Sequence, residues 1–125
     1  MEIATIAPAG RQMIESYGGG GFQVSGQRFT GSVIVGASET HSWPVTDFGA
    51  VSMESLTPVF KLDPRPDLLL IGCGSDMAIP DPALRAALKD RGVALETMAS
   101  GAACRTYNVL VGEERHVAAA LIAVE

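Results

Sequence analysis

A short, uninterrupted apolar run in the middle of the chain constrains the fold more than any other feature. Residues 67–71 read Asp-Leu-Leu-Leu-Ile and lead into Gly72-Cys-Gly74. An apolar run of this length without alternation is typical of a strand that is buried on both faces. Asp81 then suits a helix N-cap and Pro82 a first helical position, with Gly92 as the stop of a helix over 82–91. The pattern predicts a sheet with layers on both sides.

The rest of the second half repeats this alternation. Residues 93–98 form a strand pattern, Ser100 is a candidate N-cap for a helix over 101–112, and residues 115–124 are an apolar final strand. The order is therefore β-α-β-α-β. Helical crossovers between strands imply at least one parallel pair with a right-handed connection.

The first half has a different rhythm, with short strand patterns separated by glycines. Strands are expected at residues 13–17, 22–26, 28–30, 32–35 and 39–45, as an antiparallel meander. A short helix is expected after Ser52, and Pro58 either keeps it short or starts it. The predicted fold class is three-layer α/β: a central mixed β-sheet, a β-rich N-terminal half that extends or covers it, and the β-α-β-α-β second half.

Length and charge narrow the classes of function. The 125 residues fit one domain, taken as 12–125 after a loose arm at 1–11. A net charge of −5 without a basic segment excludes nucleic acid as the expected partner. Charged residues make up only 18%, which favours a contact surface and is compatible with a homodimer. We expect no direct membrane insertion and a cytoplasmic location, because there is no apolar run of ~20 residues and no targeting pattern at the start.

The glycines after the apolar run, around Gly72, Cys73 and Gly74, are the most suggestive motif. A strand followed by Gly-x-Gly and a helix can hold a phosphate or a cofactor on free backbone N–H groups. The third glycine of the dinucleotide pattern is absent, however, and the helix starts only at about Asp81. A tight turn that leaves the sheet is therefore the favoured interpretation, and no cofactor is expected.

The helix over 101–112 contains the other candidates. Cys104 is close to a helix start and next to Arg105, which can lower a thiol pKa, but a free cysteine more often packs in a core. Arg105 and Asn108 are three residues apart and share a face, which either ties the helix to loops or lines a pocket. The two histidines, His41 and His116, lack metal-ligand spacing, so neither a metal site nor a catalytic residue is expected.

Three stretches together resemble a known family. They are Met98-Ala-Ser-Gly-Ala-Ala-Cys-Arg-Thr-Tyr-Asn-Val-Leu110 with 113–122 after it, Asp67 to Gly74, and Tyr17 to Gly31. They are similar to the domain-of-unknown-function family that contains mitochondrial NADH dehydrogenase (complex I) assembly factor 3 and the adipogenesis-associated domain protein. The resemblance implies a three-layer α/β fold and, from the mitochondrial member of the family, a non-enzymatic assembly role. The lack of a transit-peptide pattern indicates a bacterial member. In other members of that family, an acidic residue and a threonine often occupy the positions of Ala99 and Ser100. Because this chain lacks that carboxylate, any ligand that the carboxylate would bind is in doubt for this chain.

Two hypotheses follow, beside a third interpretation as a purely structural domain that has neither a partner nor a pocket. The first is a binding or assembly factor that acts by protein contact, with respiratory-chain subunits as candidate partners. The second is an anion-binding protein or enzyme that uses the loops at Gly72–Asp76 and Ser100–Arg105, and it predicts that these loops meet at one pocket.

Overall fold

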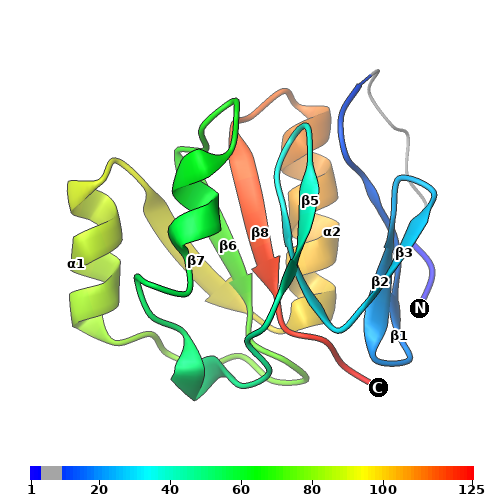
Figure 1. Ribbon diagram of the computed structural model, residues 1–125, viewed down its shortest axis with the longest axis horizontal. Helices are drawn as coiled ribbons and strands as arrows, with labels where there is room; N and C mark the ends of the chain where they lie inside the picture. Colours follow the sequence, from blue (N-terminus) through cyan, green and yellow to red (C-terminus); the bar gives the residue numbers. More distant parts are fainter. Residues whose placement is uncertain (4–9) are drawn as a thin grey trace.

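The chain forms a central sheet that is covered on both faces (Figure 1). The computed structural model describes residues 1–3 and 10–125. The elements are β1 (Ile14–Gly18), β2 (Gly21–Val24), β3 (Gln27–Thr30), β4 (Ser32–Val35), β5 (Thr40–Trp43), the 3₁₀ helices η1 (Phe48–Ala50) and η2 (Thr57–Lys61), β6 (Leu68–Gly72), α1 (Pro82–Asp90), β7 (Ala94–Met98), α2 (Ser100–Gly112) and β8 (Val117–Leu121). The predicted mixed α/β class and the β-α-β-α-β second half are confirmed.

The central sheet has five strands in the order β5-β4-β8-β6-β7. β6 is parallel to both β7 and β8, as the two crossover helices require. β4 pairs antiparallel with β8 and with β5, so the β4–β5 hairpin extends the sheet. The other three N-terminal strands form a separate antiparallel sheet in the order β1-β2-β3. The predicted meander is thus divided between two sheets.

The alternation of side chains along β6 divides the core into two halves. Leu70 faces a cluster with Tyr107 and Val111 of α2 and with Phe22 of the small sheet. Leu69 and Ile71 face the opposite way, toward α1 and the segment that contains η1 and η2. Both faces of β6 are therefore buried, which explains its continuous apolar sequence.

Helix α1 begins and ends where its sequence predicts. The side chain of Asp81 accepts a hydrogen bond of 2.9 Å from the backbone N–H of Ala83, and Pro82 follows. Gly92 has a φ of +81°, a conformation that side chains disfavour and that ends the helix.

One local prediction was partly right and another was wrong. The hydroxyl of Ser52 caps a hydrogen-bonded turn instead of a helix, and the short 3₁₀ helix η2 begins at Thr57 with Pro58 in its first turn, as one of the two alternatives predicted. Ser100 does not cap α2: Ala99 is the N-cap, and Ser100 is the first helical residue. Its hydroxyl has longer-range partners, described below.

The beginning of the chain lies along the small sheet. Glu2 forms an antiparallel bridge with Ser16, and Ile3 donates a backbone hydrogen bond of 2.8 Å to Glu15. Residues 4–9 of the expected arm lie outside the described residues. In the part of the chain that is described, no helix is long and apolar enough to cross a bilayer.

Candidate functional site

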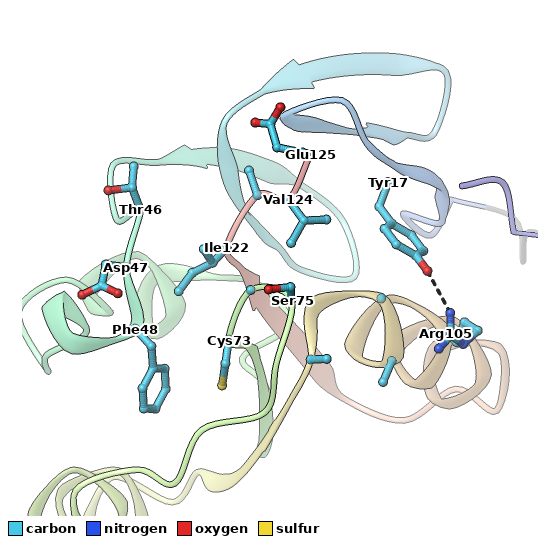
Figure 2. A pocket seen from close by; sticks show the side chains of 15 residues that line it. Tyr17, Thr46, Asp47, Phe48, Cys73, Ser75, Arg105, Ile122, Val124 and Glu125 are labelled. Carbon is cyan, nitrogen blue, oxygen red and sulfur yellow. Dashed lines mark hydrogen bonds between the residues drawn. The ribbon is translucent and has the colours of Figure 1, made fainter.

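A groove of about 740 Å³ lies where β6 ends and α2 begins. It is open to solvent on one side. Tyr17 and Arg105 lie at one end of it and Thr46, Asp47 and Phe48 at the other, as Figure 2 shows. The lining residues are Tyr17, Thr46, Asp47, Phe48, Cys73, Gly74, Ser75, Ala99, Gly101, Ala102, Arg105, Ile122, Ala123, Val124 and Glu125. The two predicted loops do meet here.

The floor of the groove depends on close packing between Gly72 and the first turn of α2. A Cβ atom at Gly72 would lie 2.8 Å from the Cα atom of Ser100. The Ser100 hydroxyl accepts a hydrogen bond of 3.0 Å from Gly74 N–H and donates one of 2.6 Å to Ile122 C=O. Gly74 C=O in turn accepts from Ser100 N–H at 2.8 Å. Gly72 and Ser100 therefore hold β6, β8 and α2 together.

The start of α2 leaves backbone donors at the groove. The first turn of an α-helix lacks intrahelical acceptors for its N–H groups. Ala99 offers no side-chain cap, and Ser100 N–H is already bonded to Gly74. Gly101 and Ala102 both line the groove. Their N–H groups are the donors that an anion would meet.

Charge along the groove is mixed. Nη1 of Arg105 donates a hydrogen bond of 3.0 Å to the hydroxyl oxygen of Tyr17, which holds the guanidinium at one end. The acidic side chains of Asp47 and Glu125 also line the groove. The charges along the groove therefore favour neither an anionic nor a cationic ligand.

Cys73 is the cysteine that reaches the groove. Its side chain is half-buried, and its backbone N–H donates to Met98 C=O at 2.8 Å. Burial raises the pKa of the Cys73 thiol above its usual value, against the smaller opposing effect of hydrogen bonds with Ala78 and Met98. A raised pKa leaves less of the thiolate that acts as a nucleophile.

Cys104 and Asn108 face the core instead. Cys104 is fully buried, and burial raises the pKa of its thiol to about 12 despite the neighbouring charge of Arg105. The Asn108 side chain accepts from Ile14 N–H at 2.9 Å and donates to Ile14 C=O at 2.8 Å. Of the predicted residues, Cys73, Gly74 and Arg105 line the groove, whereas Gly72, Ser100, Cys104 and Asn108 do not. Arg105 and Asn108 together line a separate hollow beside the start of the chain.

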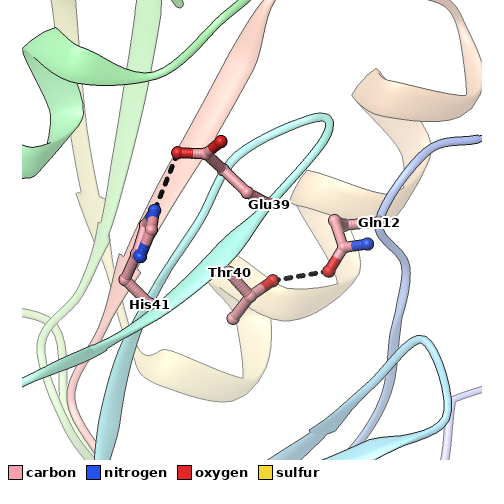
Figure 3. Close-up of polar contacts among 4 residues, drawn as sticks. All are labelled: Gln12, Glu39, Thr40 and His41. Atoms are coloured by element: carbon pink, nitrogen blue, oxygen red, sulfur yellow. Dashed lines mark hydrogen bonds and ion pairs between the residues drawn. The ribbon is translucent and has the colours of Figure 1, made fainter.

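The histidines lie elsewhere. His41 is exposed on β5, and its Nε2 lies within hydrogen-bond distance, 2.7 Å, of Oε1 of Glu39, as Figure 3 shows. Beside it, Thr40 donates a hydrogen bond of 2.8 Å to the side chain of Gln12, which links β5 to the segment before β1. Among the described residues, no three histidine, cysteine or acidic side chains are grouped as metal ligands would be.

A family model described as "Protein of unknown function (DUF498/DUF598)" matches residues 14–122. The chain belongs to the DUF498 family. NADH dehydrogenase [ubiquinone] 1 alpha subcomplex assembly factor 3 of Xenopus tropicalis is 35% identical over 109 residues, which cover 87% of this chain and 60% of that protein. The chain thus spans about 60% of the length of this animal relative.

Two bacterial relatives align with this chain over more of their length. An uncharacterized protein of Rhodobacter capsulatus is 34% identical, with 91% of this chain and 86% of that protein covered. The crystal structure of an outer membrane protein from Bartonella henselae is 36% identical and has a TM-score of 0.84, with 93% of this chain and 98% of that one covered. The resemblance inferred from the sequence is therefore confirmed.

Several groove residues of this DUF498 protein were missed by sequence reasoning. Tyr17 comes from β1, Asp47 and Phe48 from the segment after β5, and Ile122 directly follows β8. Segments far apart in the sequence and from two different sheets therefore meet at the groove. No local pattern in the sequence marks them as neighbours.

Proposed function

We propose that this chain is a non-enzymatic binding factor that assists the assembly of respiratory complex I by protein contact. The observation that carries the proposal is the similarity to the assembly factor 3 proteins over 87% of the chain. The chemistry of the groove is consistent with it, because burial raises the pKa of the Cys73 thiol that lines it, and Cys104, whose pKa is also raised, faces the core. The buried polar side chains of Ser100 and Asn108 bond to backbone groups rather than point into the groove.

The proposal also concerns where the chain acts. We place it in the cytoplasm, with protein partners and no nucleic acid, and its net charge of −5 disfavours binding to phosphate backbones. Fractionation of host cells with an antibody against the chain tests the location: recovery with the membrane pellet after a high-salt wash would contradict it.

Deletion of the gene in its host is the decisive experiment. Assembled complex I is quantified on native gels by its NADH dehydrogenase activity, with succinate dehydrogenase as the internal control. We expect complex I to fall several-fold and to return when the wild-type gene is restored. Unchanged complex I in the deletion strain would overturn the proposal.

A second candidate is an anion-binding protein that uses the groove. It is supported by the meeting of the loops at Gly72–Asp76 and Ser100–Arg105, although Asp47 and Glu125 weigh against an anion. Titration with inorganic phosphate, followed by the backbone amide NMR signals of Gly74, Gly101 and Ala102, tests it directly. Saturable shifts that are lost in Arg105→Gln would support this candidate, and absent shifts would remove it.

A further inference from the structure

The outer edge of β7 is an unpaired strand edge. β7 stands at the end of the central sheet and pairs only with β6, and no other described strand lies on its far side (Figure 1). Ala94 donates to Asp67 C=O and Met98 C=O accepts from Cys73, so these residues direct their backbone groups toward β6. Leu95 and Thr97, which alternate with them, direct theirs outward. Such a row of free groups is a template for another strand.

Basic side chains of α1 line this edge. A hollow of about 420 Å³ is lined by Arg85 and Lys89 of α1, by residues 92–95, and by the acidic residues Asp67 and Glu96. Leu95 faces α1, so the side chain of Glu96, the next residue on β7, is directed to the opposite face of the sheet. The guanidinium of Arg85 reaches across the hollow and donates a hydrogen bond of 2.6 Å to Leu95 C=O. That bond confirms that Leu95 C=O faces away from β6. It also leaves Arg85 paired with a neutral acceptor, where a carboxylate would bind more strongly.

Apolar side chains are exposed at the other end of the same surface. Ile79 is 83% exposed and Met77 is 62% exposed, both in the loop that follows β6. This loop is held beside β7, because Ala78 C=O accepts a hydrogen bond of 2.8 Å from the Thr97 hydroxyl. A second hollow of about 430 Å³ lies between Ile79 and α1 and shares Arg85 and Lys89 with the first.

We propose that the edge of β7 binds an extended, acidic segment of a partner protein as an added strand. Backbone groups of that segment would pair with Leu95 and Thr97, as in other cases of strand addition. Its carboxylates would lie on the α1 side, against Arg85 and Lys89, and an apolar residue would pack on Ile79. This inference rests on the proposed function and gives it a contact surface and a partner chemistry.

Arg85 gives the edge a closed and an open state. While its guanidinium is bonded to Leu95 C=O, it blocks one acceptor of the edge, a common protection against unwanted pairing. A carboxylate of the partner offers Arg85 a stronger, charge-assisted bond. Its transfer to that carboxylate frees Leu95 C=O for a backbone N–H of the added strand. An acidic segment is therefore admitted in preference to a neutral or basic one.

A second copy of the chain fits this edge poorly. Two β7 edges that join in one continuous sheet are related by a twofold axis perpendicular to that sheet. Both α1 helices then lie on the same face, and Arg85 and Lys89 of one copy approach those of the other. Like charges at such a junction are repulsive.

The test measures peptide binding to the purified full-length chain. The probe is a short fluorescent peptide of alternating valine and glutamate, compared with a valine–lysine peptide and with a valine–glutamate peptide that is N-methylated on alternate backbone nitrogens. We expect at least tenfold weaker binding of both comparison peptides by fluorescence anisotropy. We also expect the amide protons of Leu95 and Thr97 to gain hydrogen-exchange protection when the acidic peptide binds.

Two double variants with the same change in net charge provide the control. Arg85→Glu with Lys89→Glu should weaken binding of the acidic peptide at least tenfold. Arg28→Glu with Lys61→Glu, which alters exposed basic residues on β3 of the separate small sheet and on η2, should stay within about twofold of wild type. Circular dichroism verifies that both fold.

Several results would overturn the strand-addition proposal. They are no saturable binding, equal binding of the N-methylated peptide, or equal binding by both double variants. A chain that is dimeric by light scattering and becomes monomeric with Thr97→Pro would assign the edge to a second copy. Because these measurements use the isolated chain, their outcome is independent of whether gene deletion affects complex I.

Discussion

Helix α2 is attached to the rest of the molecule by polar bonds as well as by packing, whereas α1 is attached almost entirely by packing. Tyr107, Ser100 and Asn108 of α2 are buried, and each bonds to backbone groups of other segments. The hydroxyl of Tyr107 lies within hydrogen-bond distance of both Gln12 C=O and Gly36 C=O, which share its one proton. In α1, Leu88 is the one fully buried side chain, and Arg85 and Lys89 are exposed.

This difference separates two kinds of role. Bonds from a buried side chain to distant backbone fix position and direction, because any shift leaves a buried polar group without a partner. A helix held by one apolar face tolerates changes of its outer surface. We therefore expect α2 to be sensitive in stability and α1 to be sensitive in binding.

The largest effect on stability is expected for Asn108→Ala. The change removes both hydrogen bonds between the Asn108 side chain and Ile14. The backbone N–H and C=O of Ile14 are then buried and unpaired. We expect the free energy of unfolding to fall by about 2–4 kcal/mol in urea denaturation. Val109→Ala, at the exposed adjacent position, is the control and should change it by less than about 0.5 kcal/mol. Similar losses in both variants would show that α2 is not fixed by these bonds.

Gly72→Ala tests the contact between β6 and the start of α2. The added Cβ would meet the Ser100 backbone at 2.8 Å, so the strand or the helix must shift. We expect a loss of about 1–3 kcal/mol, as for other overpacked sites. Gly112→Ala, where a Cβ meets nothing within 4 Å at the end of α2, is the matched control and should be neutral or slightly stabilising. Thermal unfolding of the two variants makes the comparison.

Alkaline pH should lower the free energy of unfolding, because the Cys104 thiol of α2 loses its proton more easily in the unfolded chain than in the folded one. Its folded pKa is raised to about 12 from 9.0, so below pH 9.0 both states keep the proton and stability is unaffected. Between those values only the unfolded chain releases the proton. The free energy of unfolding therefore falls as pH rises, by up to about 1.4 kcal/mol per pH unit.

Urea unfolding of wild type and Cys104→Ala at a series of pH values measures this effect. The variant should lose less stability than wild type across the alkaline range. The pKa of Tyr107 is also raised by burial and adds a further decline common to both proteins. Parallel curves for the two proteins would contradict the assignment to Cys104.

The smallest effect on stability is expected for Arg85→Ala. Arg85 is exposed, and its bond to Leu95 C=O lies at the surface, so the free energy of unfolding should change by less than about 0.5 kcal/mol. The backbone amides of Leu95 and Thr97 should nevertheless exchange at least as fast as in wild type, because the strand edge loses the hydrogen bond that Arg85 makes to it. A loss above 1 kcal/mol would mean that α1 also depends on a polar bond, and the contrast with α2 would disappear.

The sequence predicted the local elements better than their partners. Asp81 and Gly92 delimit α1 because capping and positive φ act within a few residues. The apolar sequence of β6 predicted a strand buried on both faces, since burial on both faces requires it. The division of the first five strands between two sheets was beyond local reasoning, because it depends on β4 pairing with β8 about 85 residues away.

The candidate site shows the same limit. The meeting of the Gly72–Asp76 and Ser100–Arg105 loops was predicted because consecutive β-α units bring strand ends and helix starts together. The direction of each side chain was not predictable. Ser100 was expected to cap its own helix, but its hydroxyl bonds to Gly74 and Ile122, and such tertiary partners outrank a local cap. Tyr17 and Asp47 were missed for the same reason as the sheet division.

The central position of β8 has a consequence for how the protein is made. The β4–β5 hairpin and the β6–β7 pair have no edge in common until residues 117–121 are present to join them. During synthesis, β4 and β6 therefore leave the ribosome before the strand that pairs with both of them. Their backbone groups on that side are unpaired, and the core between the sheet and its helices is incomplete. Such intermediates are prone to aggregate. The period before β8 is translated is therefore when this chain is most exposed to pairing with other chains.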